Sequence, residues 1–384
     1  TPVSIFFRSV KYCILRIGVY SEYKSVMTIY PEEVSTIKSP NTIDCESPAI
    51  LEEYPSVHAR IIRGATINER SDALICKNGV YIPDYTHANL DRFRLSSENI
   101  KAHNDLYALT ITKNINNLPI DCGIKVFGNG SFNWYHWLLE ILPAAFAARC
   151  LTAEFANWPY LVPSGCDPSS TFMASLRMID SNRSTITLRE DYDYLIDKLV
   201  IFDSITSGPY NLIRDNWPRR SDVRQNDRAL MEMRDHIVGR IEAHKEDTPK
   251  RIFLYRKNGR RNYNQEEISE LCKRHGFSCV SPEDYSFEMQ VALFHHAEYI
   301  IGPSGAAWAN TLFSIFNCKS IIFSFPEFQS YAAFSNIAAL VGMQQITVKA
   351  RTNAPIISTG DAFTASYDIA PQDVEAALRH IAST

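Results

Sequence analysis

The sequence predicts an α/β protein built from more than one domain. Its 384 residues exceed the ~100–200 residues of an ordinary single domain. In the second half of the chain, short apolar β runs alternate with helical segments, which is the pattern of a parallel sheet. Hydrophobic residues make up 45% of the chain and can fill large cores, so a mainly disordered protein is excluded.

Charge and composition exclude several classes of partner. The net charge is -4, so no basic surface for nucleic acid is expected. No stretch of ~18 uncharged apolar residues occurs, so no segment is expected to span a membrane. The nine cysteines include no CxxC pair, and we interpret them as reduced thiols of a cytoplasmic protein.

The first twenty residues have the spacing of an amphipathic helix. Apolar residues recur there at intervals of four and three, whereas Arg8 and Arg16 fall on the opposite side. A basic helix of this kind can lie on an anionic membrane surface, and packing on the protein's own core is the open alternative. We therefore expect residues 1–30 to form an amphipathic helix and arm, with residues 1–20 as a peripheral contact on the inner face of a membrane.

Composition suggests domain boundaries further along the chain. Residues 31–205 are expected to form a first α/β domain, beginning with an extended arm at 31–57. Asn78-Gly79 predicts a hairpin turn within it. Residues 206–248 are polar and contain a predicted helix at 219–245, so they are interpreted as a connection between domains.

Four β runs separated by helices predict a parallel Rossmann-like sheet in residues 249–350. The runs are 251–255, 277–280, 298–302 and 319–323. Asn264 and Glu267 have capping-box spacing ahead of the first helix. Residues 351–384 are expected to be a tail that ends in a helix beginning at Pro371.

Two loops of this predicted sheet have the composition of anion sites. The loop after the first run contains Arg256, Lys257, Arg260 and Arg261, and cations at the end of a buried strand suit a diphosphate. A solvated polar loop is the alternative. The second loop, 302–307, combines small residues with the start of a helix, which favours a bound anion. A tight turn between strand and helix is the alternative. This loop lacks the P-loop and GxGxxG patterns, which argues against ATPases and NAD-dependent enzymes.

A third unusual stretch is the polar and aromatic helix start at 133–140. His136 and Glu140 are four residues apart and therefore share a helix face. An imidazole is a competent general base near neutral pH, and a carboxylate can orient it. A buried histidine bonded to backbone is the alternative. The chain has no HExxH or GxSxG motif, and the missing nucleophile elbow excludes an α/β hydrolase.

Three stretches together resemble the family 61 glycosyltransferases, which include bacterial capsular polysaccharide enzymes. They are NWYHWLLEILP, RIFLYRKNGRRNYNQEE and HGFSCVSPEDYSFEMQVALFHHAEYIIGPSGAAWANTLF. The specific signal lies in residues 127–143 and 251–323, within a similarity that covers about residues 55–345. The family usually has a histidine where this chain has Ser304, which leaves the choice of donor open.

The resemblance implies a GT-B-like architecture, with two Rossmann-like domains facing across a cleft. It also implies an inverting transfer from a nucleotide-sugar, expected to be a UDP-sugar, to a glycan or lipid-linked glycan acceptor. Capsule or other surface polysaccharide biosynthesis is the implied setting. Neither a cofactor nor a metal ion is expected, because cations and helix N-termini would stabilise the leaving diphosphate. The open alternative is a catalytically silent carbohydrate- or nucleotide-binding protein or a scaffold of a polysaccharide complex.

The same resemblance suggests roles for individual residues. His136 is the expected base, with Glu140 as its orienter or as the base in its place. The expected donor-binding residues are Arg256, Arg260, Arg261, Asn264, Gln290, Ser304, Gly305, Ala306 and Asn310. The expected acceptor-side residues are Asn133, Tyr135 and Trp137.

Overall fold

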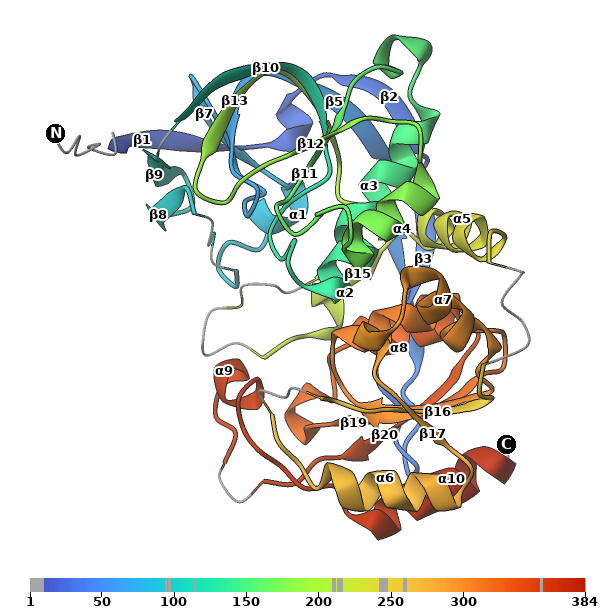
Figure 1. Ribbon diagram of the computed structural model, residues 1–384. Coiled ribbons are helices and arrows are strands. Elements are labelled where there is room, and N and C mark those ends of the chain that lie inside the picture. Colours follow the sequence, from blue (N-terminus) through green and yellow to red (C-terminus); the bar gives the residue numbers. More distant parts are fainter. Residues whose placement is uncertain are drawn as a thin grey trace, which may run out of the picture. The chain divides into compact units, whose positions relative to one another are not determined.

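The computed structural model describes residues 10–93, 95, 98–113, 115–208, 212, 217–241, 248–257, 261–352 and 355–383. The chain divides into two compact units (Figure 1). The first unit comprises residues 1–32 and 55–205, and the second comprises residues 33–54 and 206–384. Among the described helices, none has the length and apolar character needed to cross a bilayer.

The described residues of the first unit form a mixed sheet of eleven strands. The order is β12-β11-β10-β13-β5-β6-β7-β1-β9-β8, with β2 beside β5. The strands are β1 (Val10–Val19), β2 (Ser25–Tyr30), β5 (Val57–Ile67), β6 (Leu74–Cys76), β7 (Gly79–Ile82), β8 (Ile100–His103), β9 (Tyr107–Lys113), β10 (Ile115–Lys125), β11 (Tyr160–Val162), β12 (Thr185–Thr187) and β13 (Asp193–Phe202). The helices are η1 (Tyr20–Glu22), α1 (Asp84–His87), α2 (Trp134–His136), η2 (Trp137–Ile141), α3 (Leu142–Ala147), η3 (Ala148–Cys150), η4 (Ala153–Phe155) and α4 (Thr171–Ile179).

The first unit is Rossmann-like only in part, which corrects the expected first domain. Strands β12, β11, β10 and β13 are parallel, and helices connect β10 to β11. Strand β5 runs antiparallel to β13, and β6 and β7 form the hairpin predicted at Asn78-Gly79. Tight hairpin turns can join only antiparallel strands, so this part of the sheet is mixed.

The predicted N-terminal helix is wrong over Val10–Val19, which is strand β1. Its first seven residues pair antiparallel with β9, and its last three pair parallel with β7. Side chains alternate along it: Ile17 is buried, whereas Tyr12 and Ile14 are exposed. This period of two, together with strand pairing, outweighs the helical spacing. The membrane contact expected for residues 1–20 therefore loses its structural basis here, and residues 1–9 lie outside the described residues.

The second unit contains the four predicted parallel strands and a fifth, β20, that was not predicted; their order is β17-β16-β18-β19-β20. Its strands are β16 (Arg251–Leu254), β17 (Ser278–Val280), β18 (Tyr299–Pro303), β19 (Lys319–Ser324) and β20 (Gln344–Lys349). Its helices are η5 (Arg220–Asp222), α5 (Asp227–Val238), α6 (Gln265–Arg274), η7 (Pro282–Asp284), α7 (Phe287–His296), η8 (Ala306–Phe313), η9 (Pro326–Phe328), α8 (Ala333–Leu340), α9 (Thr359–Ala362) and α10 (Pro371–Ser383). Helices α6 and α10 cover one face of the sheet, and α7 and α8 cover the other (Figure 1).

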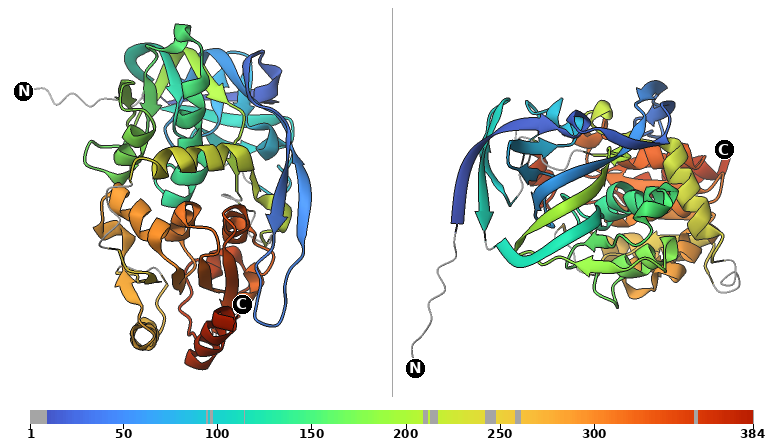
Figure 2. Two further views of the ribbon diagram at one scale, coloured as in Figure 1. Left: turned by 90° about the vertical axis from the view of Figure 1, so that its right-hand side faces the viewer. Right: turned by 90° about the horizontal axis from the view of Figure 1, so that it is seen from above.

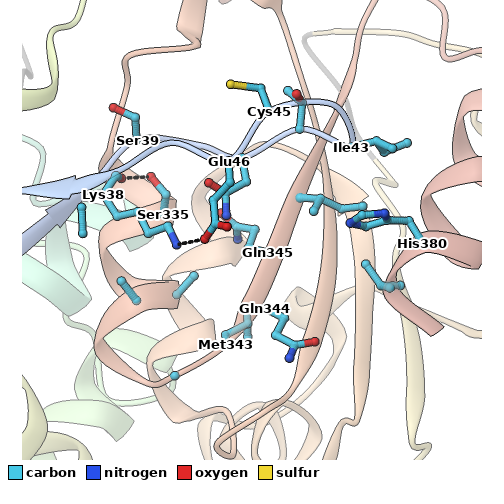
Figure 3. A pocket seen from close by; sticks show the side chains of 18 of the residues that line it. Lys38, Ser39, Ile43, Cys45, Glu46, Ser335, Met343, Gln344, Gln345 and His380 are labelled. Atoms are coloured by element: carbon cyan, nitrogen blue, oxygen red, sulfur yellow. Dashed lines mark hydrogen bonds and ion pairs between the residues drawn. The ribbon is translucent and has the colours of Figure 1, made fainter. Parts of the chain in front are cut away.

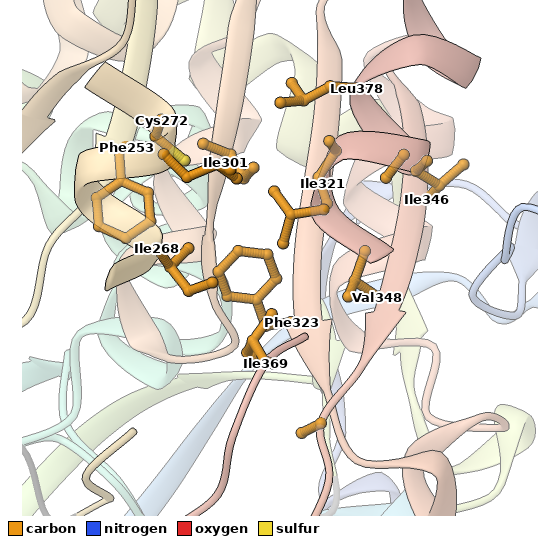
Figure 4. Packing of buried hydrophobic residues seen from close by; sticks show 14 of the residues in the cluster. Phe253, Ile268, Cys272, Ile301, Ile321, Phe323, Ile346, Val348, Ile369 and Leu378 are labelled. Atoms are coloured by element: carbon orange, nitrogen blue, oxygen red, sulfur yellow. The ribbon is translucent and has the colours of Figure 1, made fainter. Parts of the chain in front are cut away.

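One core of this unit lies under α6 and α10. Phe253, Ile301 and Phe323 extend from three adjacent strands toward Ile268 of α6 and Leu378 of α10 (Figure 4). Helix α10 begins at Pro371 as predicted, and its apolar stripe is buried. Residues 351–383 are therefore an integral part of the second unit and not a tail.

The segment predicted as an arm of the first domain is a hairpin of the second unit. Strands β3 (Glu33–Lys38) and β4 (Ala49–Tyr54) pair antiparallel, and the hairpin runs along the second unit (Figure 2). The Lys38 N–H donates to Oδ1 of Asn336 at 2.8 Å, and Asn41 accepts at 2.7 Å from the Thr347 N–H of edge strand β20. Covering this edge explains why an otherwise polar segment is ordered.

The expected connection at 206–248 also belongs to the second unit. It contains the two-stranded ladder β14 (Thr206–Ser207) and β15 (Arg224–Gln225), followed by α5. Helix α5 is shorter than predicted and contacts α7 and η8. Its first turn is held by Glu33, whose Oε1 accepts from the Asp227 N–H at 2.6 Å.

Candidate active site

The first group of candidate residues follows β10, at the carboxyl end of the parallel strands of the first unit. A turn at 128–131 leads into α2, and the Asn133 side chain accepts from the Tyr135 N–H at 2.9 Å. Asn133 is therefore the N-cap of this helix, a role that explains its residue type without an acceptor sugar.

The helix changes its hydrogen-bond pattern immediately after His136. Residues 137–141 form a π-helix, in which the Leu142 N–H donates to the Trp137 carbonyl. Pro143 follows and has no N–H to continue the α-helical ladder, so the chain accommodates it by widening one turn. Single π-turns are frequent at functional sites, and Glu140 lies within this one.

His136 and Glu140 form a close, largely buried pair. Nδ1 of His136 lies 2.9 Å from Oε2 of Glu140, and the two side chains are 12% and 16% exposed. A carboxylate at Nδ1 favours the tautomer in which Nε2 can accept a proton. Within the described residues, no donor reaches the buried Oε1 of Glu140.

The electrostatic surroundings favour a proton on this pair. Burial raises the pKa of the Glu140 carboxyl, His136 opposes that rise, and the negative charge of Asp72 adds to it. Asp72 itself accepts from the Lys125 ammonium at 2.8 Å and from the Asn129 N–H at 3.1 Å. The pair can therefore take up and release a proton, which is the requirement for a general base.

We expect Gly130→Ala to disturb the His136 ring. Gly130 has φ +77°, and a Cβ there would lie 2.8 Å from Cγ of His136. The positive φ alone costs about 1–2 kcal/mol, so the melting temperature should fall by roughly 2–8 °C and turnover should fall with it. Thermal melts and kinetic assays measure both effects. Gly165→Ala is the matched control, because a Cβ at Gly165 meets nothing within 4 Å. Equal behaviour of the two variants would contradict the close packing of this turn on His136.

The aromatic residues expected on the acceptor side lie in the interior. Trp137 is fully buried, and its indole N–H donates to Oγ of Ser175 at 2.8 Å. Tyr135 is also buried, with its ring edge-on to His136 at 5.4 Å. Trp137 is therefore a core residue, which corrects its expected role, and Tyr135 supports the imidazole.

The second group of candidate residues lies at the carboxyl ends of β16 and β18, which are adjacent parallel strands. The chain continues from β16 to β17 on one side and returns to β18 on the other, so a topological switch point lies between them. Parallel sheets bind ligands at such points. Nη2 of Arg256 and Nη2 of Arg261 both donate to the Ser304 carbonyl, at 2.8 Å for Arg261.

These two guanidinium groups form a local excess of positive charge. In the part of the chain that the structure describes, no carboxylate forms an ion pair with either of them. Burial, and then the charge of Arg256, lowers the pKa of Arg261 to about 10. Lys257 is exposed and pairs with Asp284, and Arg260 lies outside the described residues.

The small residues of the second loop permit this arrangement. A Cβ at Gly305 would lie 3.0 Å from Nη2 of Arg256, and one at Gly302 would lie 2.8 Å from Cβ of Leu254. The Ser304 N–H donates to the Phe323 carbonyl at 2.9 Å, so it cannot also bind a phosphate as expected. Gly305 and Ala306 remain as the candidate backbone donors. Because Ser304 contacts the arginines through its carbonyl, a histidine there could preserve both bonds.

The other expected donor residues have structural partners. The Asn264 side chain bonds to Glu267 and to both backbone groups of Ile369, so it joins two segments and does not form the predicted capping box. Gln290 accepts from Nδ2 of Asn310 at 3.2 Å, and both are buried between α7 and η8. We therefore remove these three residues from the candidate donor site.

A separate cavity of about 770 Å³ lies elsewhere in the second unit (Figure 3). The tip of the hairpin, helix α8, the start of β20 with Gln345, and His380 of helix α10 line it. Lys38 and Glu46 form an ion pair across the hairpin at 3.3 Å. The cavity is at the amino end of β20, away from the strand ends where parallel sheets bind ligands.

Comparison with known families bears on both groups of residues. Residues 134–321, just under half of the chain, match the family model described as Glycosyltransferase 61. The match supports a glycosyltransferase of family 61. It begins at Trp134, two residues before His136, and includes the Arg256 and Ser304 loops. No curated protein matches the chain.

Sequence reasoning missed two residues near these candidate groups. Asp72 lies between β5 and β6, and its charge acts on Glu140. Tyr367 comes about a hundred residues after the arginine loop, and its N–H donates to the Asn262 carbonyl of that loop at 3.0 Å. Neither belongs to a motif, and only the fold brings them to their partners.

Proposed function

We propose that this protein is an inverting glycosyltransferase that moves a sugar from a UDP-sugar to a glycan or lipid-linked glycan. The observation that carries the proposal is the pair of guanidinium groups at the Ser304 carbonyl, at a switch point of a parallel sheet. Two cations with no acidic partner among the described residues suit a diphosphate, whose oxygens accept paired N–H bonds. The family match supports the class of reaction.

The proposed reaction is a direct displacement at the anomeric carbon. The acceptor oxygen attacks as its proton passes to His136, and Glu140 holds the imidazole and balances its charge. The bond between the sugar and the diphosphate breaks, and its electrons remain on the diphosphate. Arg256, Arg261 and the N–H groups of Gly305 and Ala306 stabilise that charge. This scheme requires the two units to act together in a GT-B-like enzyme.

The proposed setting is the cytoplasmic synthesis of capsule or another surface polysaccharide. Activated sugars and lipid-linked glycans would supply the two substrates. The protein needs no cofactor in this proposal, because the nucleotide-sugar is itself a substrate.

A panel of nucleotide-sugars tests the function directly. We expect one UDP-sugar to release UDP in the presence of a glycan acceptor, and we expect turnover to survive EDTA because arginines stabilise the leaving group. Within the described residues, no three His, Cys, Asp or Glu side chains are grouped to hold a metal ion. Loss of turnover in EDTA that manganese restores would contradict the leaving-group assignment. Tight nucleotide binding without turnover across the panel would instead support a silent binding protein.

A further inference from the structure

The cavity beside β20 belongs entirely to the second unit. Its volume of about 770 Å³ is within the usual range of ligand pockets, ~300–1,000 Å³. The tip of the hairpin, α8, the start of β20 and the end of α10 surround it (Figure 3). None of the described residues that line it belongs to the loops of Arg256 and Ser304. The cavity is therefore a space for a small molecule separate from the candidate donor site.

The side chain of Gln345 supplies this cavity with an unused amide donor. Gln345 is only 7% exposed, and its Nε2 is buried with no hydrogen-bond partner among the described residues. A buried N–H group without an acceptor is costly, so such groups are usually bonded to a protein atom, a water molecule or a ligand. Because Gln345 lines the cavity, an acceptor oxygen of a bound molecule can satisfy this donor.

The backbone of β20 places a second donor of the same residue on this side. The Gln344 N–H donates to the Cys318 carbonyl, toward the neighbouring strand β19. The Thr347 N–H donates to the Asn41 carbonyl, toward the hairpin. Successive N–H groups of a strand point to opposite sides. The Gln345 N–H therefore points to the outer edge, as that of Thr347 does.

The charges of the lining disfavour an anionic ligand. Among the described residues that line the cavity, Lys38 is the one lysine or arginine, and its Nζ lies 3.3 Å from Oε1 of Glu46. Asp44 adds a second carboxylate. Carboxylates accept from hydroxyl groups, whereas the amide of Gln345 donates to them. Hydroxyl groups can do both, so the lining suits a neutral molecule with many hydroxyls.

We propose that this cavity binds a neutral oligosaccharide, as a glycan site separate from the proposed transfer site. Nε2 of Gln345 donates to a sugar oxygen, and the carboxylate of Glu46 accepts from a sugar hydroxyl. Ile43 and Met343 of the lining provide apolar surface for the C–H groups of the sugar rings. The inference goes beyond the proposed function, because neither His136 nor Arg256 takes part.

Calorimetry of the full chain with maltotetraose, cellotetraose and chitotetraose tests the site. We expect at least one of these neutral tetrasaccharides to bind, and Gln345→Leu to weaken its binding by about 3- to 10-fold through the loss of one hydrogen bond. The melting temperature should not fall, because the substitution removes a buried amide whose donor has no partner. Gln372→Leu makes the same chemical change at an exposed position of α10 and should leave binding within about twofold.

A second variant blocks the cavity itself. Ala339 of α8 lines it and is half-buried, so Ala339→Phe places a ring in the space of the ligand. Tetrasaccharide binding should be lost, while UDP affinity stays within about twofold and shows that the second unit is folded. Full binding in Ala339→Phe and Gln345→Leu, or no binding of any tetrasaccharide to the unaltered protein, would overturn the inference.

Two further measurements separate this site from the donor site. Arg256→Ala should leave tetrasaccharide affinity unchanged, and Gln345→Leu should leave the affinity for inorganic pyrophosphate unchanged. A loss of pyrophosphate affinity in Gln345→Leu would make the cavity an anion site and contradict the proposal. Tetrasaccharide binding that depends on Gln345, without turnover of any nucleotide-sugar, would retain the glycan site and reject the proposed function alone.

Discussion

Replacing His136 with alanine should lower kcat by about 10²- to 10⁴-fold, which is the usual contribution of a general base. Its ring nitrogen lies 2.9 Å from the Glu140 carboxylate in a largely buried setting, which suits proton transfer. UDP affinity should stay close to that of the unaltered protein, because the proposed phosphate ligands belong to the second unit. Initial rates under saturating donor, with calorimetry of UDP binding, measure both quantities.

Glu140→Gln decides between the two candidate bases. If Glu140 only orients the imidazole, the glutamine variant should retain more activity than His136→Ala. A near-normal kcat in His136→Ala beside a collapsed kcat in Glu140→Gln would make Glu140 the base.

Replacing Arg256 with alanine should weaken UDP binding by about 10- to 100-fold, since a charge-assisted hydrogen bond contributes roughly 1.5–3 kcal/mol. The loss leaves Arg261 as the remaining described cation at the Ser304 carbonyl. Lys257→Ala is the matched control: it removes a cation from the same loop, but one that is exposed and paired with Asp284. Its UDP affinity should stay within about twofold. Unchanged affinity in Arg256→Ala would contradict the proposed diphosphate site.

Most of the parallel sheet of the second unit could be predicted, because the sequence patterns of its strands and helices lie within short stretches of the chain. Four strands of the parallel sheet are short apolar runs, and each of these is followed by a helix or helical turn with an apolar side. The fifth strand, β20, has the more polar sequence QQITVK and was not predicted. Gly276 has φ +79° at the end of α6, as a helix C-cap requires. Because β16 and β18 are adjacent parallel strands, the loops that follow them lie at the same edge of the sheet, and this closeness could be predicted from the strand order alone.

The first unit and the hairpin were less predictable because their order depends on distant pairing. Strand β1 has a sequence that suits a helix, and its partner β9 lies about a hundred residues later in the chain. The hairpin β3–β4 has few periodic positions, and contacts with α8 and β20 order it. Asn264 and Trp137 have residue types that suit a ligand site. In the structure they instead bond to distant parts of the chain, Asn264 to Ile369 and Trp137 to Ser175.

The hairpin β3–β4 also affects how the chain can be made. Lys38 bonds to Asn336, which lies 298 positions later, so at ~5–20 residues per second the ribosome needs roughly 15–60 s to supply the partner. Until that partner has been synthesised, the hairpin is a solvent-exposed pair of strands. In this state it can misassemble or bind a chaperone. A fragment that starts at residue 206 would contain the whole parallel sheet but leave the edge of β20 uncovered. Expression of the second unit alone therefore requires residues 33–54 to be grafted back through a new linker.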